Sequence, residues 1–88
     1  MKKQYNMATL LKSDGSSISN VEIDTLQQQQ ALVGGYIEYV YIGETEQVLI
    51  VNEEGLLDDY PVINAEASQL AQKTIVGDVI LAMSSELN

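Results

Sequence analysis

Hydrophobic and polar positions at the start of the chain predict a β-hairpin. Residues 5–12 carry β-compatible side chains and end at the turn cluster Ser13-Asp14-Gly15-Ser16, in which the glycine can adopt a positive φ. Beyond the turn, Ile18 precedes residues 21–24, where apolar and acidic side chains alternate with a period of two. We therefore expect an extended return through Ile18, Val21 and Ile23 that pairs with the first segment.

The next segment has a helical composition between two recognisable ends. The Thr25 side chain can accept a hydrogen bond from an amide two or three residues further on, which favours a helix over residues 26–33. The glutamines at 27–30 are expected to form a solvated face of this helix rather than a low-complexity tract. Gly34-Gly35 ends it, because one glycine can take the left-handed conformation of a C-cap.

Two strongly β-prone segments follow and predict an antiparallel hairpin. Residues 36–42 and residues 47–52 both combine β-branched and other apolar side chains. The loop between them, 43–46, is short enough to require antiparallel neighbours. Residues 48–51 are apolar on both faces, which favours an interior position in the sheet.

The remaining segments predict a second helix and a last buried strand. Residues 56–61 are expected to be a short exposed segment, because the proline in it opposes a long ladder. Asn64 is a good N-cap for a helix over residues 65–73. Residues 79–83 have the continuous apolar character of a buried strand, and residues 84–88 are expected to fray.

Together these elements predict one small acidic domain spanning residues 1–88. The order of strands and helices favours an α+β fold. We expect a largely antiparallel sheet of four to five strands with two short helices on one face.

Composition excludes several kinds of chemistry. The chain has no cysteine and no histidine, which removes the thiolate nucleophile, the imidazole base, and haem or Cys/His zinc ligation. It has no arginine, and Gly34-Gly35 has no lysine beside it, so a phosphate-binding loop is not expected. The acids at 53, 54, 58 and 59 lack the spacing of a calcium loop. We therefore expect no enzyme activity, no cofactor and no metal site.

Charge indicates which partners are disfavoured. Thirteen acids face four lysines, giving a formal net charge of −9, and three of those lysines lie within the first twelve residues. Such a surface repels nucleic acid and anionic membranes and attracts basic surfaces. No apolar run approaches the length of about 20 residues that a membrane-spanning helix needs. A soluble cytoplasmic protein is expected.

Two sequence blocks resemble a known family. Residues 33–38 read VGGYIE and residues 52–55 read NEEG, and a Gly-Asp pair follows at residues 77–78. This pattern is similar to short uncharacterised domains known mainly from bacteria, phages and mobile elements, over roughly residues 5–83. The resemblance implies an accessory protein in a host cytoplasm without an established activity. Its motif residues are Gly34, Gly35, Asn52, Gly55, Asn64, Gly77 and Asp78.

Two positions depart from the pattern of that family. Leu56 stands where a basic residue is expected after the second block, and Ala65 follows Asn64 where the family usually has arginine. An anion-binding role that depends on those basic residues is not expected of this chain.

Binding to another protein is the leading functional interpretation. We expect an acidic surface, made of Glu44, Glu46, Glu53, Glu54, Asp58 and Asp59, that either only keeps the protein soluble or contacts a partner. A basic nucleic-acid-binding groove of a host protein is one such partner. Tyrosine suits half-exposed interfaces, so Tyr36, Tyr39 and Tyr41 are candidate anchors, with Tyr39 and Tyr41 on one face of their strand and Tyr36 on the other.

The alternative is a homodimer that binds a small ligand between its subunits. Such a pocket needs polar groups that converge on a concavity, and the candidates are Asn52, Asn64 and the amides of Gly34-Gly35. Their convergence favours the ligand interpretation, whereas a flat acidic face favours the protein partner.

Overall fold

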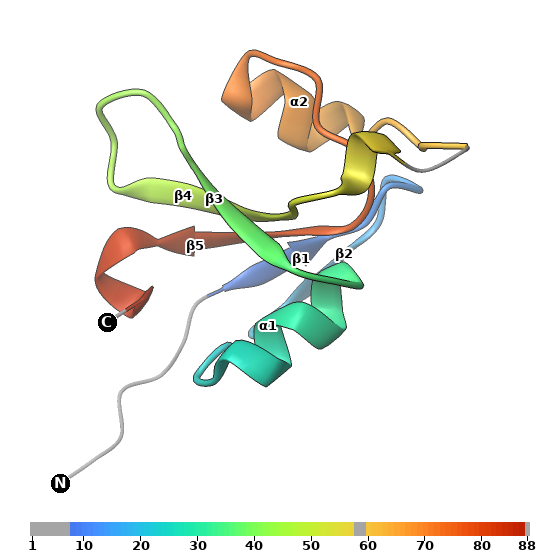
Figure 1. Cartoon of the computed structure of the whole chain (residues 1–88). Helices are drawn as coiled ribbons and strands as arrows, with labels where there is room; N and C mark the ends of the chain where they lie inside the picture. The colour runs from blue at the N-terminus through green and yellow to red at the C-terminus, as the bar shows by residue number, and fades with distance from the viewer. Residues whose placement is uncertain (1–7, 58–59, 88) are drawn as a thin grey trace, which may run out of the picture.

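Five strands form one antiparallel sheet, in the order β2-β1-β5-β4-β3 (Figure 1). The computed structural model describes residues 8–57 and 60–87. The strands are β1 (Thr9–Leu11), β2 (Ser17–Ser19), β3 (Ile37–Tyr41), β4 (Gln47–Asn52) and β5 (Val79–Met83). The last strand, β5, pairs with both β1 and β4 and so joins two hairpins that do not pair with each other. The predicted α+β class with a largely antiparallel sheet is confirmed.

The first hairpin forms as predicted, but its second strand lies earlier in the chain. The turn closes through a hydrogen bond of 2.9 Å from the Lys12 amide to the Ser16 carbonyl, with Gly15 at φ 96°. Pairing therefore starts at Ser17, directly after the turn, and β2 ends at Ser19, before Asn20 turns the chain at φ 59°. The predicted return is confirmed for Ile18, which lies in β2, but its extension over residues 21–24 is wrong. That segment instead carries Ile23 into the core, and residues 5–7 lie outside the described part of the chain.

The first helix, α1 (Leu26–Val33), has the predicted ends. Thr25 forms a capping box with Gln28, and Gly34 ends the helix in the left-handed conformation at φ 85°. The prediction of a solvated glutamine face is wrong for Gln29, which is buried. Its side chain donates to the Ile23 carbonyl at 2.9 Å and accepts from the Tyr39 hydroxyl at 3.4 Å. These bonds satisfy the amide that the fold removes from water.

The second helix, α2 (Ala65–Ala71), begins at the predicted cap and ends earlier than predicted. Asn64 is its N-cap, and Gln72 takes a left-handed conformation at φ 57°, which stops the helix before Lys73. Two short 3-10 helices complete the fold, η1 (Gly55–Leu57) and η2 (Ser84–Leu87), the latter in place of the predicted fraying. No helix in residues 8–57 or 60–87 is long and apolar enough to cross a membrane.

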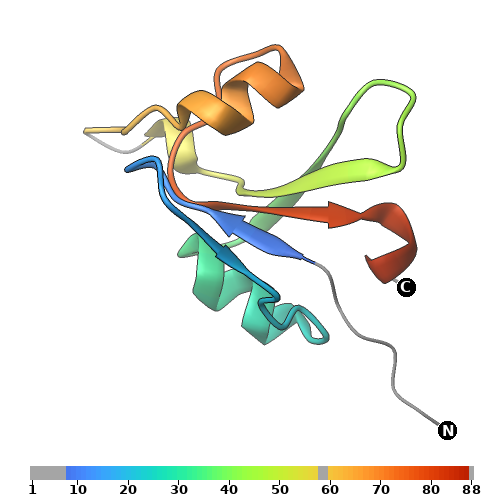
Figure 2. The same cartoon turned by 180° about the vertical axis from the view of Figure 1, so that it is seen from behind.

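The two helices cover opposite faces of the sheet, and the prediction that both lie on one face is wrong. Figure 1 shows α2 above the sheet and α1 below it, and Figure 2 shows the same arrangement from behind. One buried cluster contains Val33 of α1 together with Val48 and Ile50. The other contains Ala67 of α2 together with Leu49 and Val51. Because β4 is apolar at four consecutive positions, both of its faces need cover.

Truncating one β4 side chain on each face tests this two-core arrangement. We expect Leu49→Ala and Ile50→Ala each to lower the free energy of unfolding by about 2–5 kcal/mol, because both side chains are fully buried. Urea titration followed by circular dichroism measures the losses. Ile18→Ala, at a half-exposed position on β2, is the control and should cost far less. A near-neutral Leu49→Ala would mean that α2 leaves its face of the sheet uncovered.

Candidate functional site

The motif residues gather at one end of the sheet. At this end β1 and β4 finish, at Leu11 and Asn52, and β3 and β5 begin, at Ile37 and Val79. We call it the motif end. The segments that carry the motif residues enter or leave the strands here. The motif residues are Gly34, Gly35, Asn52, Gly55, Asn64, Gly77 and Asp78.

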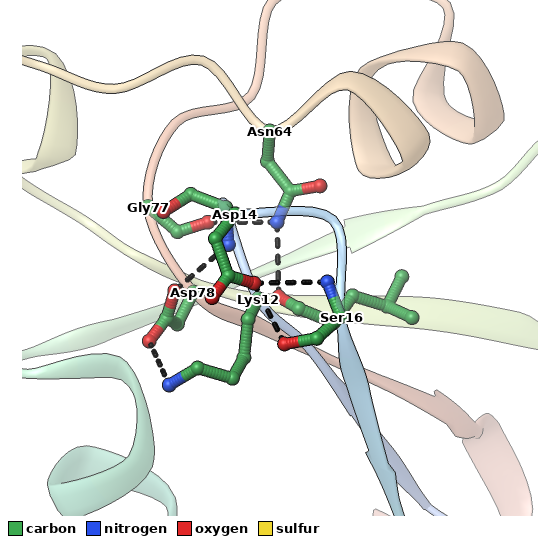
Figure 3. Close-up of polar contacts among 8 residues, drawn as sticks. Lys12, Asp14, Ser16, Asn64, Gly77 and Asp78 are labelled. Carbon is green, nitrogen blue, oxygen red and sulfur yellow. Dashed lines mark hydrogen bonds and ion pairs between the residues drawn. The ribbon is translucent and has the colours of Figure 1, made fainter.

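Asn64 is the most heavily bonded of these residues. Its side chain is 1% exposed, and its Nδ2 donates to the carbonyls of Leu11 at 2.9 Å and Gly77 at 2.8 Å (Figure 3). Its Oδ1 accepts from the Ala67 amide at 3.1 Å, which caps α2. The amide therefore joins the end of β1, the turn before β5 and the start of α2. We call this set of bonds the Asn64 clamp.

Asp78 ties the first hairpin to the start of β5. One carboxylate oxygen accepts from the Ser13 amide at 2.9 Å, and the other lies 3.4 Å from Lys12 Nζ (Figure 3). The ion pair is about one-third exposed on both sides, so solvent screens it and it contributes little to stability by itself. The amide bond is the part of this contact that fixes the turn.

Asp14 stabilises the same turn from its exposed side. Its carboxylate accepts from the Ser16 hydroxyl at 2.6 Å and from the Ser16 amide at 2.9 Å (Figure 3). These two hydrogen bonds hold the pKa of Asp14 below its ordinary value. The ionised form therefore favours the folded turn above the ordinary pKa, and this contribution is lost as the pH falls through the lowered value.

The glycine pair and Asn52 form a second tie. Asn52 Nδ2 donates to the Val33 carbonyl at 3.3 Å, and its Oδ1 accepts from the Glu54 amide at 2.8 Å. A Cβ on Gly35 would lie 3.1 Å from that Nδ2, so any larger residue at position 35 would crowd the Asn52 side chain. The amides of Gly34 and Gly35 both donate to the Gln30 carbonyl in the helix cap. The predicted ligand pocket would need both amides to bond the ligand, but both are already bonded within the helix cap.

Gly55 is needed for close packing between η1 and the chain before β5. A Cβ at this position would come within 2.7 Å of Val76 Cγ2. Gly77 takes φ 79° in the turn that the Asn64 clamp holds. The motif residues therefore tie the loops of the motif end together.

Two hollows open at the motif end. The first, of about 420 Å³, lies between the end of α1 and η1 and is lined by Gln30, the glycine pair, Tyr36, Asn52, Glu54 and Leu57. The second, of about 260 Å³, is lined by residues that include Asn52, Tyr60, Pro61, Val62 and Asp78. Asn52 borders both hollows. The ligand interpretation required three polar groups to converge on a concavity. The Asn64 side chain is engaged in the clamp, so of these groups only the Asn52 side chain both borders a hollow and can accept a further hydrogen bond.

The predicted acidic surface does not form one patch among the described residues. Glu44 and Glu46 lie in the loop before β4, whereas Glu53 and Glu54 follow its other end. Asp58 and Asp59 lie outside the described residues. In residues 8–57 and 60–87, no three acidic side chains gather closely enough to hold a metal ion.

Tyr39 and Tyr41 share one face of β3, as their alternation predicts. Tyr39 and Tyr41 pair with Ile50 and Val48, and so lie on the face that α1 covers. Tyr36 precedes the strand and lines the first hollow. It is 67% exposed.

Exposed apolar side chains lie at the motif end, where the sequence predicted an exposed segment over residues 56–61 but no binding site. Leu57 is 79% exposed, Tyr60 is 89% exposed and Val62 is 57% exposed. Together with Tyr36 they line the two hollows, and we call these four residues the apolar rim. The available signal was the apolar content of residues 56–63, in a segment that the proline keeps out of a ladder.

These observations define a small α+β domain with a tightly bonded motif end and an apolar rim. The chain belongs to the family described as Domain of unknown function (DUF3846), whose model matches residues 7–86. The prediction of a family of uncharacterised domains is confirmed. The two sequence blocks as marks of that family, and its link to bacteria, phages and mobile elements, stay predictions. Comparison with curated proteins and with solved structures finds no match.

Substitutions of Asn64 test the clamp against simple helix capping. We expect Asn64→Ala to lower the free energy of unfolding by about 2–4 kcal/mol, because one buried and one part-buried carbonyl lose their donor along with the cap. Thr25→Ala removes a cap alone and should cost about 1 kcal/mol. Asn64→Asp keeps the cap acceptor but cannot donate, so it should resemble Asn64→Ala. A wild-type urea midpoint for Asn64→Asp would contradict the clamp.

Proposed function

We propose that this domain is a protein-binding module without catalytic activity, and that the apolar rim is its docking surface. The observation that carries the proposal is the exposure of Tyr36, Leu57, Tyr60 and Val62 at one end of the sheet. Exposed apolar side chains that gather beside polar ones are typical of interaction sites on small proteins. Tyrosine is also enriched at the centres of protein interfaces.

The charge of the chain favours a basic partner. The formal net charge is −9, and the exposed Glu53 and Glu54 lie next to the apolar rim in the chain. A partner that presents apolar side chains flanked by lysine or arginine would complement this surface. A pure mimic of nucleic-acid phosphate has less support, because Glu44 and Glu46 lie at the other end of β4.

The absence of catalysis is supported by the chemistry of the motif end. The sequence has no histidine or cysteine, and the side chains of Asn52, Asn64 and Asp78 are engaged in structural hydrogen bonds. An accessory role in a phage or mobile element rests on the family resemblance alone.

A second candidate function is the binding of a small ligand by a homodimer. The first hollow favours it, because about 420 Å³ is within the range of small-molecule sites. Its support is weaker, since the glycine amides and the Asn64 side chain are occupied by internal bonds.

Matched surface variants distinguish the docking surface from the rest of the molecule. Wild type, Leu57→Ser/Tyr60→Ser and the control Ile18→Ser/Tyr41→Ser are immobilised and exposed to lysate of cells that carry the gene. Both variants remove exposed apolar side chains, at the motif end and away from it respectively. We expect the same protein to be retained by wild type and control and lost by the rim variant, with equal thermal midpoints for all three.

A salt arm of the same experiment separates apolar docking from an electrostatic mimic. At 0.5 M NaCl the Debye length is about 4 Å, so a partner held mainly by charge should be released, whereas one held on the apolar rim should stay. Retention by the rim variant together with loss by the control would contradict the proposed surface. A bound small molecule with no retained protein would favour the second candidate function.

A further inference from the structure

The residues that line the first hollow carry negative charge and no positively charged side chain. Glu54 is the only ionisable acid among its lining residues, and none of them is a lysine. Its other lining residues include Gln30 and Asn52, which carry amide groups, and Tyr36 and Leu57, which carry an aromatic ring and an aliphatic side chain. A side chain that enters this hollow therefore meets acceptors, an aromatic ring and an apolar wall.

The C-terminus of α1 adds partial negative charge beside the first hollow. A helix C-terminus concentrates partial negative charge on its last carbonyls, which normally favours a basic residue nearby. The last turn of α1 contains no basic residue, and the helix ends at Gly34 on the border of the hollow. The two lysines in the described part of the chain lie elsewhere, with Lys12 paired to Asp78 and Lys73 beyond the end of α2.

The acceptors of the hollow are held in place by the motif itself. The Glu54 amide donates to Asn52 Oδ1, which fixes the turn that carries the Glu54 side chain. The amide oxygen of Asn52 has a second lone pair, so it can accept a further hydrogen bond from a ligand. A single carboxylate is too few oxygens for a calcium or magnesium ion, which favours an organic cation.

We propose that the first hollow receives an arginine side chain of the protein partner. A guanidinium group has five donors in one plane, which suits a carboxylate at one edge and an amide oxygen at another. Its flat face can stack on the Tyr36 ring, and its aliphatic stem can lie along Leu57. This inference rests on the proposed function and adds to it the residue type that the partner must present.

Titration of the labelled protein with paired peptides tests the proposal. The probes are acetyl-Gly-Ala-Arg-Ala-Gly-amide and the same peptide with citrulline, which keeps the shape of arginine without its charge. We expect the arginine peptide to shift the backbone NMR signals of Gly34, Gly35, Tyr36 and Glu54 and to leave those of residues 43–46 in place. The citrulline peptide should bind about tenfold more weakly, the factor that a charge-assisted hydrogen bond supplies.

Two variants assign the effect to the hollow. Glu54→Gln keeps the backbone bond to Asn52 and should weaken the arginine peptide about tenfold. Glu46→Gln, in the loop before β4, removes the same charge at the other end of the strand and should leave the affinity unchanged. Equal binding of the arginine and citrulline peptides, or equal effects of the two variants, would overturn the proposal.

The outcomes also separate this inference from the proposed function. If the rim variant loses the partner while the arginine peptide leaves the hollow unshifted, the arginine site is wrong and the docking surface stands. If free ethylguanidinium binds as tightly as the arginine peptide, the assignment to a protein side chain is overturned. Selective binding of the arginine peptide supports the site even if the rim variant retains the partner, in which case the docking surface is wrong.

Discussion

Burial of the Asn64 side-chain amide ties together three segments at the motif end. A primary amide that leaves water must find partners for its donors and its acceptor, and here each finds one in a different segment. The end of β1, the turn before β5 and the start of α2 are thereby fixed to one another. This also explains how β5, distant in sequence from both hairpins, enters the centre of the sheet beside β1.

The internal bonds of the motif end divide its residues into two groups. Asn52, Asn64 and Asp78 are occupied in holding loops, and the glycines supply room or a left-handed turn. The side chains that those bonds do not use, those of the apolar rim, are exposed to water. Exposed apolar side chains beside polar ones are typical of docking sites.

Local features of the fold were predictable from the sequence, and the placement of its parts in space was not. Thr25 and Asn64 indicate helix starts because their side chains can cap a helix, and Gly34 indicates a helix end because it can adopt a left-handed conformation. The apolar run of β4 indicates an interior strand. The chain places α1 on one face of the sheet and α2 on the other. Hydrophobic periodicity predicts which side of a helix is buried, but it does not predict which face of the sheet the helix covers. Gln29 was missed for a similar reason, because its burial depends on Ile23 and Tyr39, which are close only in the folded chain.

Solvent exchange of the Asn64 side-chain amide protons, followed by NMR, shows whether the Asn64 clamp forms in solution. Both protons are donated to backbone carbonyls, and Asn64 itself is 1% exposed. We expect them to exchange as slowly as the backbone amides of β4. Exchange as fast as that of the exposed Asn20 side chain would contradict this expectation, because the clamp would then be absent in solution.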